Sequence, residues 1–105
     1  MLRGRFFFVH RRDRDAGEEA LPVDCLPRLG LVVPKKLCKL AVRRNLAKRV
    51  VREAFRQHKA GLPACDLVFR LAINVNRLEW PAAKVLLAAD ARALLARCRA
   101  PRPAA

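Results

Sequence analysis

The sequence has 105 residues, of which 53% are apolar, and its formal net charge is +14 at pH 7. This length fits one domain with a modest core, and the apolar content excludes a disordered basic tail, so residues 1–105 are expected to form a single domain. The excess of positive charge favours nucleic acid or anionic lipid as the partner.

Three strands and two helices are predicted along the chain. Short apolar or aromatic runs that end at charged residues or proline predict strands at residues 5–12, 28–33 and 65–73. A helix is predicted from about residue 40 to the glycine and proline that follow residue 60, because both are stop signals. A second helix is predicted from about residue 79 to residue 97, with a proline tolerated in its first turn.

The remaining segments are predicted to be loops. Residues 13–26 are rich in acidic side chains and include Gly17 and Pro22, which predicts a flexible loop, and residues 99–105 predict a disordered tail. The element order β-β-α-β-α indicates a small α+β domain, in which two helices pack on a short sheet of about three to four strands.

Positive charge is concentrated in the first predicted helix and the segment before it. Residues 35–59 contain ten lysines or arginines and one glutamate, a net charge of +9. On a helical wheel at about 100° per residue, one arc is apolar and consists of Val42, Leu46, Ala47, Val50, Val51, Ala54 and Phe55. The opposite arc is mostly basic and consists of Arg44, Asn45, Lys48, Arg49, Arg52 and Arg56. Only Arg43 fits neither arc.

This basic arc can be interpreted in three ways. A charged face is ordinarily solvated, but solvated faces usually place glutamate one turn from lysine, whereas here four basic residues follow one another at that spacing and repel each other. A membrane-surface helix sets bulky Trp, Phe or Leu against lipid. The apolar arc here is mostly valine and alanine, which suits packing on a sheet. The planar fork of arginine matches phosphate oxygens, so we favour nucleic acid.

The sequence contains no catalytic or metal-binding pattern. The four cysteines form no CxxC pair, and neither His10 nor His58 lies at a metal-ligand spacing from them, which disfavours a zinc site. Without a secretory signal, the cysteines are expected to be reduced thiols in a cytoplasmic protein, and no apolar run has the length of a membrane span. A solvated loop explains the acidic residues between 13 and 24. No catalytic residue, and no metal or cofactor bound by the protein, is therefore predicted.

Residues 28–56 resemble the signature region of the bacterial ribonuclease P protein component, and they read RLGLVVPKKLCKLAVRRNLAKRVVREAFR. In that family, a strand and two lysines lead into a basic helix with the RNR motif, AV-x-RN-x-x-KR-x-x-RE-x-FR. Residues 30–36 match the strand and the lysines, although Pro34 stands where the family more often has a small polar residue. The matching helix residues are Ala41, Val42, Arg44, Asn45, Lys48, Arg49, Arg52, Glu53, Phe55 and Arg56. The flanking strands fit more loosely, so the resemblance covers residues 5–98.

The resemblance implies the RNA-binding subunit of an endoribonuclease. In the family, a catalytic RNA removes the 5′ leader of precursor tRNA with magnesium ions held by RNA and substrate, while the protein assists that RNA and contacts the leader. The implied partners are therefore the ribonuclease P RNA and precursor tRNA, with no membrane and no obligate protein partner. The residues implied to bind RNA are Lys35, Lys36, Arg44, Asn45, Lys48, Arg49, Arg52 and Arg56.

The family binds the leader in a cleft between the sheet and an N-terminal helix. Alternation along residues 5–12 places Phe6, Phe8 and His10 on one face of the strand, and Phe7 and Val9 on the other. The resemblance assigns the first set to the leader, whereas the alternative is that all three phenylalanines belong to the core. The family usually begins with a helix before this strand, and this sequence begins almost at the strand. That helix is therefore expected to be missing, and the cleft is expected to lose one wall.

Two other functions fit the same composition. A ribosomal-type structural protein would also bind folded RNA through a basic helix, and only the ordered motif at residues 28–56 distinguishes the two. A DNA-binding module would place this helix in a major groove, where base readout favours Asn, Gln or Ser among the arginines, and Asn45 is the only candidate.

Overall fold

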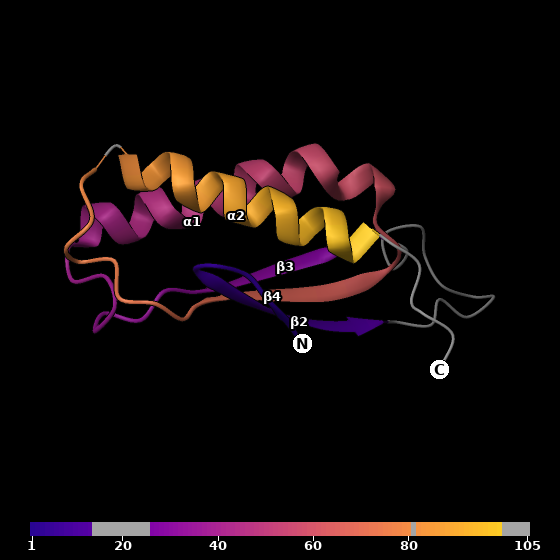
Figure 1. Cartoon of the computed structure of the whole chain (residues 1–105). Helices are drawn as coiled ribbons and strands as arrows, with labels where there is room; N and C mark the ends of the chain where they lie inside the picture. Colours follow the sequence, from indigo (N-terminus) through magenta and orange to yellow (C-terminus); the bar gives the residue numbers. More distant parts are fainter. Residues whose placement is uncertain (14–25, 81, 100–105) are drawn as a thin grey trace.

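The computed structural model describes residues 1–13, 26–80 and 82–99. Helices α1 and α2 lie side by side on one face of a four-stranded sheet (Figure 1). In chain order the elements are β1 (Leu2–Arg3), β2 (Phe7–Asp13), β3 (Arg28–Val32), α1 (Ala41–His58), a 3-10 turn (Lys59–Gly61), β4 (Cys65–Leu71) and α2 (Ala82–Arg99). The predicted α+β domain is confirmed. The predicted loop and tail lie almost entirely outside the described residues.

The sheet has the strand order β1-β2-β4-β3. Strand β2 is antiparallel to β1 and β4, whereas β3 is parallel to β4. A parallel pair needs a crossover connection, and α1 supplies it between β3 and β4. The basic helix therefore lies beside β3, at the edge of the sheet.

The core fills the space between the sheet and the two helices. Every second residue of β4 is buried, and Phe7 and Val9 of β2 are buried on the same side. The rings of Phe7 and Phe69 meet edge to face with 5.9 Å between their centroids, which contributes about 0.5–1.5 kcal/mol beyond the buried area. The helix residues that close the core are Ala47, Val50, Val51 and Ala54 of α1, and Leu87, Ala91, Leu94 and Leu95 of α2.

The apolar arc predicted for α1 is confirmed at the centre of the helix and wrong at its start. Val42 is 69% exposed, because it lies in the first turn, ahead of the first buried residue of the helix. Leu46 and Phe55 are half-buried. Arg43, which fits neither arc, lies beside Trp80 with its guanidinium carbon 5.7 Å from the ring centroid.

A carboxylate of α2 holds the start of the described chain. Asp90 accepts hydrogen bonds from the backbone N–H groups of Arg5, Phe6 and Phe7 at 2.8–3.0 Å. Gly4 lies so close that a Cβ at this position would be 2.6 Å from Asp90 Oδ1, which leaves no room for a side chain. These three hydrogen bonds, here called the Asp90 latch, fix the chain where it passes from β1 to β2. Strand β1 has only two residues, too few to show an alternating pattern in the sequence.

Candidate nucleic-acid interface

One side of α1 carries an exposed row of polar and basic side chains. This basic helix face consists of Asn45, Lys48, Arg49, Arg52 and Arg56. Lys48 is half-buried and the other four residues are exposed. Within the described residues, no hydrogen bond or ion pair engages the charged ends of Lys48, Arg49 or Arg52. These three cations are therefore available to an external anion.

Arg56 differs from the other cations of the basic helix face because it has an acidic partner. Its guanidinium donates hydrogen bonds to the carboxylate of Glu53, one of them from Nε at 3.3 Å. The hydrogen bond from Arg56 lowers the pKa of Glu53, and in turn raises the pKa of Arg56. Both groups are solvent-exposed, so salt and water weaken this pair. Arg56 is consequently the least available cation of the row.

Arg44, predicted to bind RNA, is turned toward its own backbone. Its Nη1 donates hydrogen bonds to the carbonyl oxygens of Cys38 at 3.0 Å and Lys39 at 2.7 Å. The side chain thus fixes the segment that enters α1, where the helix has no side-chain cap and no acidic residue in its first turn. In this arrangement Arg44 supports the neighbouring basic segment.

Lys35 and Lys36 are exposed in the turn that follows β3, and Asn76 braces this turn. The Asn76 side chain donates to the carbonyl of Lys36 at 3.1 Å and accepts from the backbone N–H of Lys39 at 2.7 Å. The backbone N–H of Val75 adds a bond to Leu37 O at 2.9 Å. The segment after β4 therefore positions the lysine pair. Sequence reasoning missed Asn76, because its partners are about forty residues away in the chain.

The helices lie on one face of the sheet (Figure 1), and the opposite face carries aromatic and basic side chains. This open sheet face includes Arg3, Phe8, His10, Val68 and Arg70, which the strand register places as neighbours. Phe8 pairs with Arg70 on β4 and with Arg3 on β1, and the Arg3 guanidinium lies 5.3 Å from the centre of its ring. His10 is exposed, and Phe8 is half-buried.

The assignment of Phe6 to the same face as Phe8 and His10 is wrong. Phe6 precedes β2, so the alternation of the strand does not extend to it, and its side chain is only 5% exposed within the core. Arg3 and Arg70 are additions to the predicted set. The alternation along β4 could have placed Arg70 on the outer face, but only the register shows that it lies opposite Phe8.

The described part of the chain offers surfaces for binding. Among the described residues, no three His, Cys, Asp or Glu side chains gather to hold a metal ion. Burial raises the pKa of the Cys38 and Cys98 thiols, which leaves them protonated and unreactive at neutral pH. None of the helices in the described ranges has both the length and the apolar character needed to cross a membrane.

Comparison with known proteins shows which family the chain belongs to. The family model described as Ribonuclease P matches residues 1–98. The chain belongs to the ribonuclease P protein family. A ribonuclease P protein component from Azoarcus sp. strain BH72 is 48% identical over 75 residues, which cover 71% of this chain and 56% of that protein. The one from Bordetella parapertussis is 41% identical over 96 residues, which cover 89% of this chain and 70% of that protein.

Solved structures of ribonuclease P proteins share the fold. The Staphylococcus aureus RNase P protein matches with a TM-score of 0.70 at 25% identity, over 91% of this chain and 77% of that one. The Thermotoga maritima protein matches with a TM-score of 0.57 at 30% identity, over 87% of this chain and 80% of that one. The resemblance predicted from residues 28–56 is confirmed. The chain spans 56% of the length of the Azoarcus protein, and the same share of a ribonuclease P protein component from Aromatoleum aromaticum.

Proposed function

We propose that the protein is the RNA-binding subunit of ribonuclease P. In this role it binds the catalytic RNA through the basic helix face and the 5′ leader of precursor tRNA through the open sheet face. Family membership supports the ribonuclease P role. The observation that carries the choice of surfaces is that no hydrogen bond or ion pair within the described residues engages Lys48, Arg49 or Arg52 on α1. Magnesium and the cleavage chemistry are assigned to the RNA, and the protein contributes binding and positioning.

The basic helix face suits the phosphates of a folded RNA. Lys48, Arg49 and Arg52 project from consecutive turns of one helix, and Lys35 and Lys36 continue the charge in the braced turn before it. Each phosphate that such a cation neutralises releases condensed counterions, which drives association at low salt. Contact with phosphate also relieves the repulsion between the cations.

The open sheet face suits an unpaired RNA strand. The Phe8 ring is half-buried in the sheet, which fixes its orientation, and arginines lie on both sides of it across the strands. Bases stack on aromatic rings with about 1–3 kcal/mol per base and little dependence on sequence. The arginines and the exposed His10 can contact the phosphates that connect the stacked bases. We assign the leader contact to Phe8 and His10, and add Arg70.

Reconstitution tests the proposed role. The protein is added to ribonuclease P RNA at low magnesium concentration, and cleavage of precursor tRNA is followed. We expect stimulation by the protein, and weaker RNA binding by Arg52→Ala. A matched control is Lys84→Ala, which removes an exposed cation from α2. Binding of folded RNA without stimulation of cleavage would instead favour a ribosomal-type structural role.

A second measurement tests the leader contact. Precursor tRNAs with a one-nucleotide and an eight-nucleotide leader are compared with the wild-type protein and Phe8→Ala at equal salt. Loss of a single base stack, about 1 kcal/mol, should reduce the affinity gained from the longer leader about fivefold. If Phe8→Ala gains as much affinity from the longer leader as the wild type does, the open sheet face is not the leader site. The proposed contact between the basic helix face and the catalytic RNA would not be affected by that result.

A further inference from the structure

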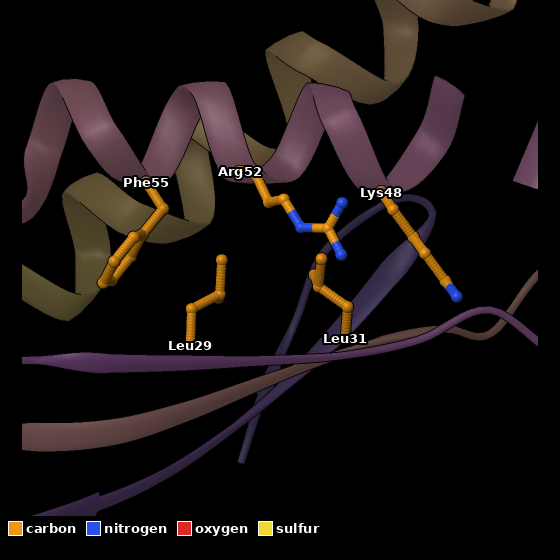
Figure 2. A pocket seen from close by; sticks show the side chains of 5 residues that line it. All are labelled: Leu29, Leu31, Lys48, Arg52 and Phe55. Carbon is orange, nitrogen blue, oxygen red and sulfur yellow. The ribbon is translucent and has the colours of Figure 1, made fainter. Parts of the chain in front are cut away.

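A cavity opens between α1 and β3, at the edge of the sheet (Figure 2). Its volume is about 350 Å³, which is near the lower end of the range of about 300–1,000 Å³ found for small-molecule sites. Leu29 and Leu31 form one wall from β3, and the lining residues of α1 are Lys48, Arg52 and Phe55. The cavity therefore joins the basic helix face to the outermost strand of the sheet.

The lining is apolar at one end and carries both cations toward the other, where Leu31 lies beside Arg52 (Figure 2). In Figure 2, the Phe55 ring and Leu29 approach each other at one end, whereas the Arg52 guanidinium and the Lys48 ammonium extend toward the other. Phe55, Leu29 and Leu31 are only half-buried, so apolar surface remains that an occupant could remove from water. None of the described residues that line the cavity is acidic. Such a site suits a flat apolar group attached to an anion.

We propose that this cavity receives one unstacked base of an RNA strand, with the adjacent phosphate held by Arg52 and Lys48. This inference rests on the proposed function, and it adds a base-binding subsite to a helix face that otherwise contacts phosphates. The Phe55 ring provides the stacking surface, and the two leucines cover the other edges of the base. Single-stranded loops and bulges supply such splayed bases in folded RNA. The helix face would thereby distinguish an RNA with a flipped base at the correct place from a uniform duplex.

A peptide strand is the competing occupant, because β3 is an edge strand of the described sheet. Edge strands can accept an extended peptide through backbone hydrogen bonds. The base is favoured because the cavity lies between the strand and the helix, and two cations and an aromatic ring face it. A strand added at the edge would need neither of these features.

The probe is adenosine 5′-monophosphate. It is titrated into the full chain, and two-dimensional NMR spectra record the shifts of the backbone amide signals. We expect saturating shifts at Leu29, Leu31 and Phe55, and only weak shifts near Arg52 with ribose 5-phosphate. Phe55→Leu keeps an apolar side chain but removes the ring. It should lower the affinity for the nucleotide at least about fivefold, which corresponds to a stacking energy of about 1 kcal/mol. The affinity for ribose 5-phosphate should not change.

Variants of the cations complete the design. Arg52→Gln should lower the affinity for both the nucleotide and ribose 5-phosphate, whereas Lys84→Ala on α2 should change neither affinity. Shifts confined to β2 and β4 around Phe8, or equal affinity for nucleotide and sugar phosphate, would overturn the base assignment. Shifts at β3 with an acetylated Glu-Val-Glu-Val peptide but none with the nucleotide would make the edge a peptide site instead.

The two hypotheses fail separately. If the protein stimulates ribonuclease P RNA and the nucleotide leaves the cavity unperturbed, the proposed function stands and the base subsite is rejected. If cleavage is not stimulated, the proposed function fails whatever the nucleotide does. For an RNA-level check, a hairpin with one bulged adenosine should bind more tightly than the same hairpin with an abasic bulge, and Phe55→Leu should remove the difference.

Discussion

Asp90 shows how a single carboxylate organises the start of the described chain. It accepts three backbone N–H groups, and those of Phe6 and Phe7 are partly buried. Asp90→Ala leaves these donors without a hydrogen-bond partner. Each buried donor that loses its partner costs about 1–3 kcal/mol. We therefore expect the free energy of unfolding to fall by about 2–4 kcal/mol in urea denaturation. Asp90→Asn keeps one acceptor oxygen and should lose less. Equal stability of Asp90→Ala and the wild type would show that the latch does not form in solution.

Glu53 should titrate below the ordinary range for a glutamate. The hydrogen bond from Arg56 favours its charged form and lowers its pKa, and the charges of Arg56 and Arg49 act in the same direction. Because the folded pKa is the lower one, the associated stabilisation is present at neutral pH and is lost as pH falls through the folded pKa. Side-chain carboxyl NMR should show the shift, and both Arg56→Gln and high salt should reduce it. The expectation fails if the pKa of Glu53 is the same in Arg56→Gln.

At the scale of one element, adjacent residues of α1 separate folding from binding. Val51 is 1% exposed, and Arg52 next to it is exposed on the basic helix face. Val51→Ala should cost about 2–3 kcal/mol of stability through lost burial and a residual cavity. Arg52→Ala should change stability by less than about 0.5 kcal/mol while weakening RNA binding. Thermal melts and RNA titrations of both variants provide the measurement. A strong loss of stability in Arg52→Ala would contradict this division of the helix.

Element patterns were predictable from the sequence wherever a local period controls burial. The helical spacing of Ala47, Val50 and Ala54 predicted the packed side of α1, and alternation predicted Phe7 and Val9 as one set. The errors lie where an element ends. Val42 and Phe6 continue the local pattern in sequence, but the first lies in the exposed first turn of its helix and the second precedes its strand.

Parts of the candidate site depend on pairings that no local pattern specifies. Arg70 joins Phe8 only through the antiparallel register, and Asn76 reaches Lys36 across about forty residues. Arg44 carries the motif signature, but its hydrogen bonds to the preceding carbonyls follow from how the chain enters the helix. Resemblance to a family identified the basic residues. It could not distinguish those that face outward from the one that holds the backbone.

At the scale of the whole molecule, the two proposed RNA surfaces lie on opposite sides of the sheet. The helices cover one face (Figure 1), and the strand register places Phe8 and Arg70 together on the other, so both surfaces can be occupied at once. Arg52→Ala should therefore weaken binding of the catalytic RNA by the same factor with and without Phe8→Ala, and Phe8→Ala should weaken binding of the leader by the same factor with and without Arg52→Ala, because the sites share no contact.

Salt dependence should distinguish the two surfaces by their chemistry. If Lys35, Lys36, Lys48, Arg49 and Arg52 neutralise four to five phosphates, the logarithm of the association constant should fall with the logarithm of salt concentration at a slope of about −4. Arg52→Ala removes one phosphate contact and should flatten the slope by about one unit. Arg56→Ala should flatten it less, because Glu53 already neutralises that guanidinium. Phe8→Ala removes stacking and no charge, so it should weaken leader binding with the slope unchanged. The slopes of the wild type and of the three variants are measured by titrating each protein with ribonuclease P RNA and with a leader oligonucleotide across a salt series. A slope near zero for the wild type would show that the basic helix face does not bind phosphate.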